Sequence, residues 1–146
     1  MVLIALPGMS AQAAPDQDKA WVVAVMQAVA DAWNKGVQPP AALFEPSLTI
    51  VDNTPPYLFQ GRAAIEQWQA AYAASQPSAI AGAQTALRLG APLSVETNAA
   101  HAYIALPADW TTTQNGHSEV ARGVVTATLN HSPQGWRIAG WIWTPR

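Results

Sequence analysis

The spacing of hydrophobic residues changes along the chain, from a helical repeat to strict alternation. Apolar residues between positions 21 and 33 recur every three or four residues, which predicts a helix that begins at Pro15-Asp16 and ends before Gly36. Between Leu87 and Val95, apolar and other residues alternate, which is typical of a strand. A chain with helices first and strands afterwards is expected to form an α+β domain, with helices packed on one face of a mostly antiparallel sheet.

Turn signals and β-branched runs divide the rest of the chain. A second helix is expected after Gly61 and before Pro77, because apolar residues fall on one helical face between them. Asn115-Gly116 is a hairpin turn signal. Pro107 indicates a sheet edge or a bulge, since proline has no N–H for a ladder. We expect a short turn of helix at 41–44 and strands at 47–52, 57–59, 87–95, 100–113, 120–130 and 136–144.

Composition excludes several classes of function. Charged residues make up 11% of the chain and the net charge is −2, which argues against a nucleic-acid binder or a protein held on an anionic membrane. Cysteine is absent, so disulfides, thiol catalysis and cysteine-ligated metals are excluded. The histidines have no metal-ligand spacing, and no phosphate-binding or dinucleotide motif occurs, so we expect no metal and no cofactor.

The first residues have the features of a targeting segment rather than of a fold. Residues 1–9 are mostly apolar, and residues 10–14 supply the small-x-small pattern of a signal-peptidase site, with cleavage after Ala13 or Ala14. This run is too short to span a bilayer, and it lacks a basic start. We therefore expect residues 1–14 to be a signal peptide or apolar leader, residues 15–146 to be one domain, and the protein to be periplasmic or secreted.

Several segments resemble a known superfamily. These are residues 32–36 (AWNKG), 42–46 (ALFEP), 48–52 (LTIVD), 59–65 (FQGRAAI) with Trp68, and the closing residues 135–144. Together they resemble the nuclear transport factor 2-like superfamily, which includes ketosteroid isomerases and SnoaL-like polyketide cyclases. The resemblance implies a bacterial exported member with a cone-shaped, cystatin-like α+β roll, in which a curved sheet wraps helices around a pocket. The fold does not assign the chemistry.

Asp52 is the principal catalytic candidate, and this assignment rests on the resemblance. It matches the position of the general-base Asp of ketosteroid isomerases, at the same interval after Ala-Leu-Phe. The alternative is that Asp52 only caps the turn that follows it. The matching positions for the isomerases' two oxyanion-hole donors fall at Ala28 and near Val125 or Thr126, so the resemblance does not extend to that complete machinery.

Aromatic residues supply the other candidates for a pocket. We expect the pocket to be lined by Tyr57, Trp68, Tyr103, Trp110 and Trp143. Tyr103 shares strand parity with His101 and Asp109, so these three face one side of the sheet, but parity does not choose between the pocket side and the surface.

The last strand has apolar residues on both faces. Trp141 and Trp143 share one parity, and Trp136, Ile138, Gly140 and Ile142 share the other. An apolar two-sided sheet is expected to be covered on both sides, which indicates a homodimer formed through the sheet.

Two functions follow from these expectations. In the first, the domain binds a small apolar or aromatic molecule, and Asp52 acts as an acid and base in an isomerisation, dehydration or cyclisation. In the second, the protein is a non-catalytic dimerisation or protein-association domain.

Overall fold

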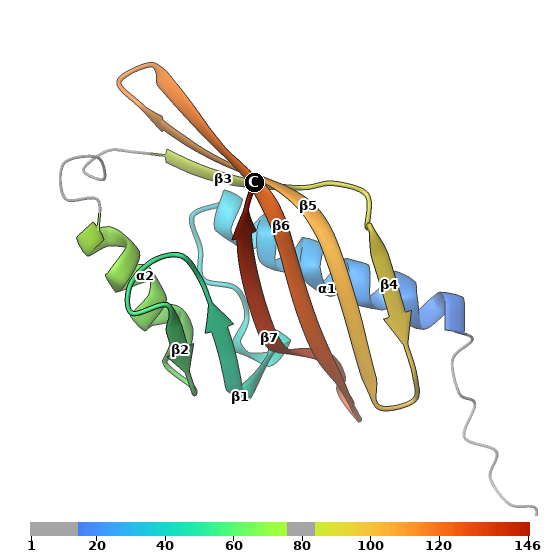
Figure 1. The fold of residues 1–146 in the computed structure, drawn as a ribbon. Helices are drawn as coiled ribbons and strands as arrows, with labels where there is room; N and C mark the ends of the chain where they lie inside the picture. The colour runs from blue at the N-terminus through green and yellow to red at the C-terminus, as the bar shows by residue number, and fades with distance from the viewer. Residues whose placement is uncertain (1–14, 76–83) are drawn as a thin grey trace, which may run out of the picture.

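Two helices lie against one large sheet in the computed structural model, which describes residues 15–75 and 84–146 (Figure 1). The helical elements are α1 (Pro15–Asn34), the short 3₁₀ turn η1 (Ala41–Leu43) and α2 (Ala64–Ser75). The strands are β1 (Phe44–Val51), β2 (Leu58–Gln60), β3 (Gln84–Leu89), β4 (Ser94–Thr97), β5 (His101–Gln114), β6 (His117–Ser132) and β7 (Gly135–Pro145). The predicted α+β class is confirmed. The expected leader, residues 1–14, lies outside the described residues.

The sheet has the strand order β2-β1-β7-β6-β5-β3, and β4 also pairs with β5. Every pair is antiparallel except β1 with β7, which run parallel. The β5–β6 hairpin turns at Asn115-Gly116, whose φ angles of 52° and 77° are those that the predicted two-residue turn requires.

The expected strand over residues 87–95 is wrong, because two strands occupy this region. β3 ends at Leu89 and β4 begins at Ser94, and Pro92, which cannot donate to a ladder, lies in the break. The oxygen of Pro107 accepts the N–H of Gly90 at 2.8 Å, so Pro107 lies opposite the same break. The N–H and C=O of one strand residue point to the same side of the strand. Because the Pro107 oxygen points toward Gly90 and away from β6, the N–H that proline lacks would not have bonded β6.

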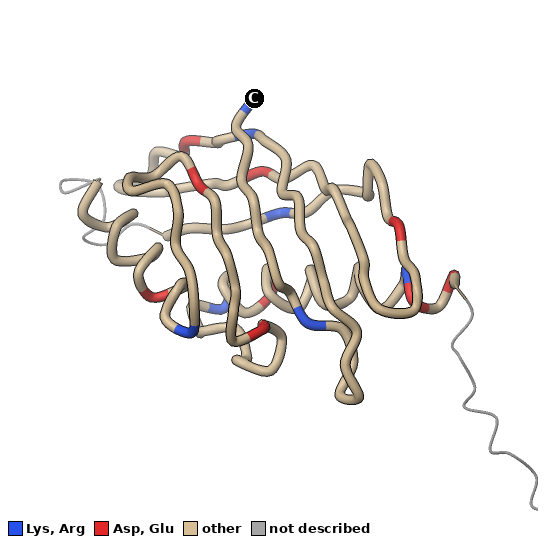
Figure 2. The backbone as a smooth tube through the Cα atoms, turned by 60° about the horizontal axis from the view of Figure 1, so that its bottom comes forward, with Lys and Arg blue, Asp and Glu red and all other residues tan. Residues whose placement is uncertain are grey.

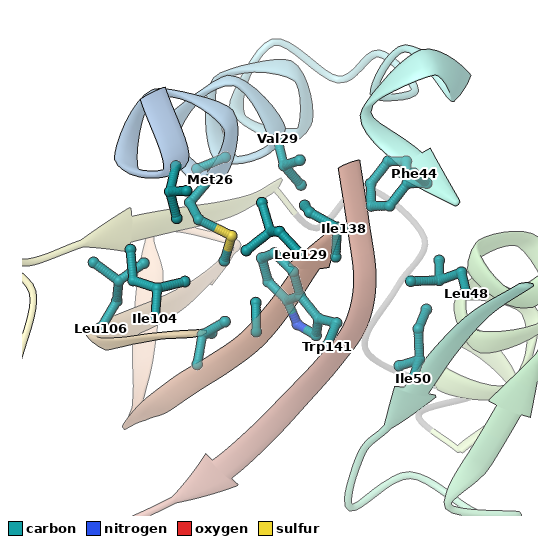
Figure 3. Close-up of a cluster of buried hydrophobic side chains, with 14 of the residues drawn as sticks. Met26, Val29, Phe44, Leu48, Ile50, Ile104, Leu106, Leu129, Ile138 and Trp141 are labelled. Atoms are coloured by element: carbon teal, nitrogen blue, oxygen red, sulfur yellow. The ribbon is translucent and has the colours of Figure 1, made fainter. Parts of the chain in front are cut away.

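Helix α1 supplies the core with one buried stripe. Val22, Met26 and Val29 are fully buried, at the spacing that places them on one helical face. Met26 and Val29 point toward the sheet, where Leu129 and Ile138 are also fully buried (Figure 3). The helix ends as predicted before Gly36, which has φ 71°. The Gly36 N–H bonds the Trp33 oxygen and the next N–H bonds the Ala32 oxygen, which is a Schellman cap.

A bulge in β7 changes which side chains face α1. Leu129 pairs with Ile138, but Thr128 pairs with Gly140, so one extra residue lies in β7 at this point. Trp136 and Trp141 are therefore both buried, with exposed fractions of 4% and 7%. The expectation that they lie on opposite faces is wrong, because a one-residue bulge reverses the parity of every residue after it.

The charged residues are few and scattered over the backbone (Figure 2). The one ion pair among the described residues joins Arg122 Nε to Asp109 Oδ1 at 3.9 Å, and both side chains are substantially exposed. No described helix is long and apolar enough to cross a membrane.

Candidate functional site

A cavity of about 330 Å³ opens between the sheet and α2. Its wall includes the buried carboxylate of Asp52 and five of the seven tryptophans. These tryptophans are Trp33, Trp68, Trp110, Trp141 and Trp143. Apolar walls with a few polar groups are typical of small-molecule sites, and the volume falls at the small end of such sites.

The tryptophans reach the cavity from four separate elements. Trp33 comes from the last turn of α1, Trp68 from α2, Trp110 from β5, and the other two from β7. Trp33 is at the centre, because its ring centroid lies 5.5 Å from that of Trp68, 5.8 Å from Trp110 and 5.4 Å from Trp141. Aromatic pairs at these separations add about 0.5–1.5 kcal/mol each beyond the area that they bury.

Three indole N–H groups of this cluster are buried without a hydrogen-bond acceptor. The Nε1 atoms of Trp33, Trp68 and Trp110 have no partner among the described residues. A buried donor left unpaired costs about 1–3 kcal/mol. Edge-to-face packing, as in the Trp33–Trp110 and Trp68–Trp110 pairs, returns only part of that energy.

Asp52 lies directly after β1, where the chain turns beneath the cavity. Its side chain is 9% exposed, and Oδ1 accepts the N–H of Thr54 at 2.8 Å. Its own N–H donates to the oxygen of Tyr57 at 3.1 Å, which closes the turn. Asp52 thus caps its turn and also lines the cavity, so the two interpretations of this residue do not exclude each other. It is the one carboxylate among the described lining residues.

The structure does not bring Tyr57 and Tyr103 to this cavity, which corrects that expectation. Tyr57 has φ 74° in the turn after β1, and its side chain is 58% exposed. Tyr103 lies on the face of β5 opposite to the buried Ala102 and Ile104, as its parity requires. His101 shares this outer face, and its Nδ1 lies 3.1 Å from Asn130 Oδ1. The other three aromatic candidates, Trp68, Trp110 and Trp143, line the cavity.

Sequence reasoning missed three aromatic members of the wall. Trp33 and Tyr72 follow the helical stripes of apolar residues and were not among the candidates for the pocket, yet both line the cavity. Trp141 shares the parity of Trp143, and that parity was the available signal. Val125, at one of the positions where the resemblance places an oxyanion-hole donor, is 1% exposed and forms apolar wall. In residues 15–75 and 84–146, no three His, Cys, Asp or Glu side chains come close enough to hold a metal ion.

Comparison with solved structures identifies the fold. A candidate dehydratase of the NTF2-like family from Streptomyces avermitilis superposes with a TM-score of 0.72 at 16% identity, over 91% of this chain and 99% of that one. A candidate aromatic ring hydroxylase from Novosphingobium aromaticivorans gives a TM-score of 0.72 at 13% identity, over 91% and 92% of the two chains. An NTF2-like superfamily protein from Salmonella enterica gives 0.70 at 17%, over 90% and 93%.

No family model and no curated protein sequence matches the chain. The fold is therefore established from structure: it is a cystatin-like fold, which the chain shares with these NTF2-like proteins. The predicted resemblance is confirmed at this level. At these identities the likeness concerns the fold alone and assigns no reaction.

Proposed function

We propose that the protein binds a small, largely apolar ring compound in the tryptophan-lined cavity, and that Asp52 exchanges a proton with it. The observation that carries the proposal is the placement of one buried carboxylate on a wall that also holds five tryptophans and a tyrosine. Aromatic walls favour flat apolar ligands, and a carboxylate selects those with a removable proton.

The geometry of Asp52 supports acid–base chemistry. The Thr54 N–H donates to Oδ1 and so orients the carboxylate, and we expect Oδ2 to be the atom that a ligand proton meets. A carboxylate in this position can remove a proton from carbon or oxygen and return it elsewhere, which is the step shared by isomerisation, dehydration and cyclisation. The similar structure described as a candidate dehydratase is compatible with this reaction class.

Two variants of Asp52 separate its cap from its chemistry. Asp52→Asn keeps an oxygen that accepts the Thr54 N–H but removes the base, so we expect stability within about 0.5 kcal/mol of the wild type. Asp52→Ala removes both, so we expect a loss of about 1–2 kcal/mol. Once the thermal-shift screen described next has identified a ligand, its turnover should fall at least about a hundredfold in both variants. Unchanged turnover in Asp52→Asn would remove Asp52 from the mechanism.

A thermal-shift screen identifies the ligand class. The panel contains steroids, aromatic polyketides, terpenes and phenolic acids, each with wild type and Asp52→Asn. A ligand at a hundredfold excess over its Kd stabilises the folded state by about 2.7 kcal/mol, which raises the Tm measurably. Tryptophan fluorescence provides a second readout, because five of the seven tryptophans line the cavity. A panel with no shift and no quenching would favour the second function below.

The second candidate function is association through the outer face of the sheet. Leu58, Val51 and Ile142 lie side by side across β2, β1 and β7, and they are exposed by 50%, 38% and 40%. This apolar row supports the proposed homodimer. Ile142→Lys should then give a monomer by light scattering. Val120→Lys, at an equally exposed position on the β5–β6 hairpin outside the row, should stay dimeric.

Export is a separate proposal that rests on residues 1–14. Expression of the full chain in a bacterium should give a periplasmic or secreted product whose first residue is Ala14 or Pro15. An intact N-terminus in the cytoplasmic fraction would contradict it.

A further inference from the structure

A second cavity of about 310 Å³ adjoins the first, and the same aromatic residues line both. Trp33, Trp68, Tyr72 and Trp110 border the Asp52 cavity and also the second cavity. The second cavity is completed by residues that do not touch the first, among them Val37, Thr85 and Thr112. The four shared rings therefore lie between the two cavities, and we call them the partition and the second cavity the second chamber.

The four rings of the partition are not held equally. Within the described residues, the Trp33 ring packs against three tryptophans, Trp68 against Trp33, Trp110 and Tyr72, and Trp110 against two tryptophans. The Tyr72 ring has one aromatic neighbour, Trp68, at 6.2 Å. Tyr72 is also near the end of α2, a helix in which Ala64 is the one buried residue. Tyr72 is thus the member that can be removed with the least loss of packing.

We propose that Tyr72 separates the Asp52 cavity from the second chamber and so sets the length of ligand that the site accepts. With the tyrosine ring in place, the site holds a compound that fits one chamber. Without it, the two chambers join past the edge of the tryptophan cluster, and a longer compound reaches the second chamber with its proton-bearing end still at Asp52. This inference rests on the proposed ligand-binding function and adds a residue that determines specificity.

The side chains that line the second chamber indicate which chemical groups the longer ligand should carry. Thr85 and Thr112 are register partners on β3 and β5, and both line it. Their hydroxyl groups can donate and accept hydrogen bonds beside the apolar surface of Val37 and the tryptophans. The two chambers together therefore suit a two-part aromatic compound, with a hydroxyl group at the Asp52 end and an aryl extension that tolerates a polar substituent.

The test compares two probes that differ by one ring. 2-Naphthol carries the hydroxyl group on a ring system sized for one chamber, and 6-phenyl-2-naphthol adds the aryl extension. Isothermal titration of the wild type should give at least a tenfold preference for 2-naphthol. Tyr72→Ala should bind 6-phenyl-2-naphthol at least tenfold more tightly than the wild type, while its affinity for 2-naphthol changes less than threefold.

Matched variants show whether the opened partition is the cause. Tyr72→Phe keeps the ring and should behave as the wild type. Val37→Ala enlarges the second chamber without opening the partition, and should also behave as the wild type. Tyr72→Leu keeps apolar bulk for the packing of α2 and should reproduce the gain, which decides the test if Tyr72→Ala does not fold. Adding Thr112→Phe to Tyr72→Leu fills the chamber and should remove the gain.

The outcomes distinguish the two proposals. If the wild type binds 2-naphthol but the ratio of the two affinities is the same in Tyr72→Ala and Tyr72→Leu, the role of Tyr72 is refuted and the ligand-binding function stands. Equal binding of both probes by the wild type refutes the role of Tyr72 in the same way. If neither the wild type nor the Tyr72 variants bind either probe at their solubility limits, the aromatic ligand class of the proposed function is refuted as well.

Discussion

Asn34 joins the end of α1 to an edge strand of the sheet, and replacing it should destabilise the part of that strand that lines the Asp52 cavity. Its Nδ2 donates to the oxygen of Leu87 at 2.9 Å, and its Oδ1 accepts the N–H of Leu87 at 2.7 Å. Both backbone groups of Leu87 therefore point away from β5, to the side on which β3 has no neighbouring strand. Leu87 lines the Asp52 cavity and is the register partner of Trp110.

The cost of Asn34→Ala follows from these two bonds. A typical intramolecular hydrogen bond contributes about 0.5–1.5 kcal/mol net, and both bonds here are partly buried. Removing both gives a loss of about 2 kcal/mol in the free energy of unfolding. For a domain of this size, that loss lowers the Tm by about 5–10 °C. Gln38→Ala is the control, because it removes one exposed bond, from Gln38 to Gln69, and should cost less than about 0.5 kcal/mol.

Hydrogen exchange tests the location of the effect as well as its size. If β3 opens locally, the protection of the Leu87 amide should fall about thirtyfold for 2 kcal/mol, while amides in the centre of β6 follow only the global change. Asn34→Asp keeps an acceptor for this amide and should retain part of its protection. Stability within about 0.5 kcal/mol of the wild type, with an unchanged Leu87 amide, would refute the reasoning.

Three further substitutions test the core and the cluster. Gly123→Ala should lower the free energy of unfolding by about 1–3 kcal/mol in urea, because the added carbon would meet the Trp143 ring at 2.7 Å and the Thr144 oxygen. Gly90→Ala is the control and should cost less, because the nearest atom to its added carbon is 3.4 Å away. Met26→Ala should cost about 2–5 kcal/mol in the same assay, because Met26 is fully buried; a loss under about 1 kcal/mol would contradict its place in the core. Trp33→Phe should abolish most of the near-ultraviolet circular dichroism, and Trp21→Phe, at 45% exposure, should preserve it.

Local signals predicted the elements well because each depends on neighbouring residues. The stripe from Val22 to Val29 is buried as a helical face, and Asn115-Gly116 forms the hairpin that its left-handed preference requires. The break between β3 and β4 was missed because the alternation of Leu87 to Val95 continues through it. Pro92 was the signal, since a proline in the middle of an apparent strand argues against that strand.

The candidate site was predicted only in part, because it depends on parity across long strands. Tyr103 and Trp110 belong to the same strand, and one faces solvent while the other lines the cavity. No local pattern chooses the face, since the choice depends on where α1 packs. The β7 bulge adds a second nonlocal effect, because it brings Trp136 and Trp141 to one face despite their opposite parity.

The composition of the cluster is itself an argument for a function. Leucine and phenylalanine fill a core without polar atoms, whereas a buried tryptophan needs an acceptor for its N–H. Here the Nε1 atoms of Trp33, Trp68 and Trp110 have no acceptor among the described residues. The same rings form the wall of two cavities instead of closing them. A cluster that serves stability alone would close such cavities, whereas one that presents flat aromatic faces to a ligand leaves them open.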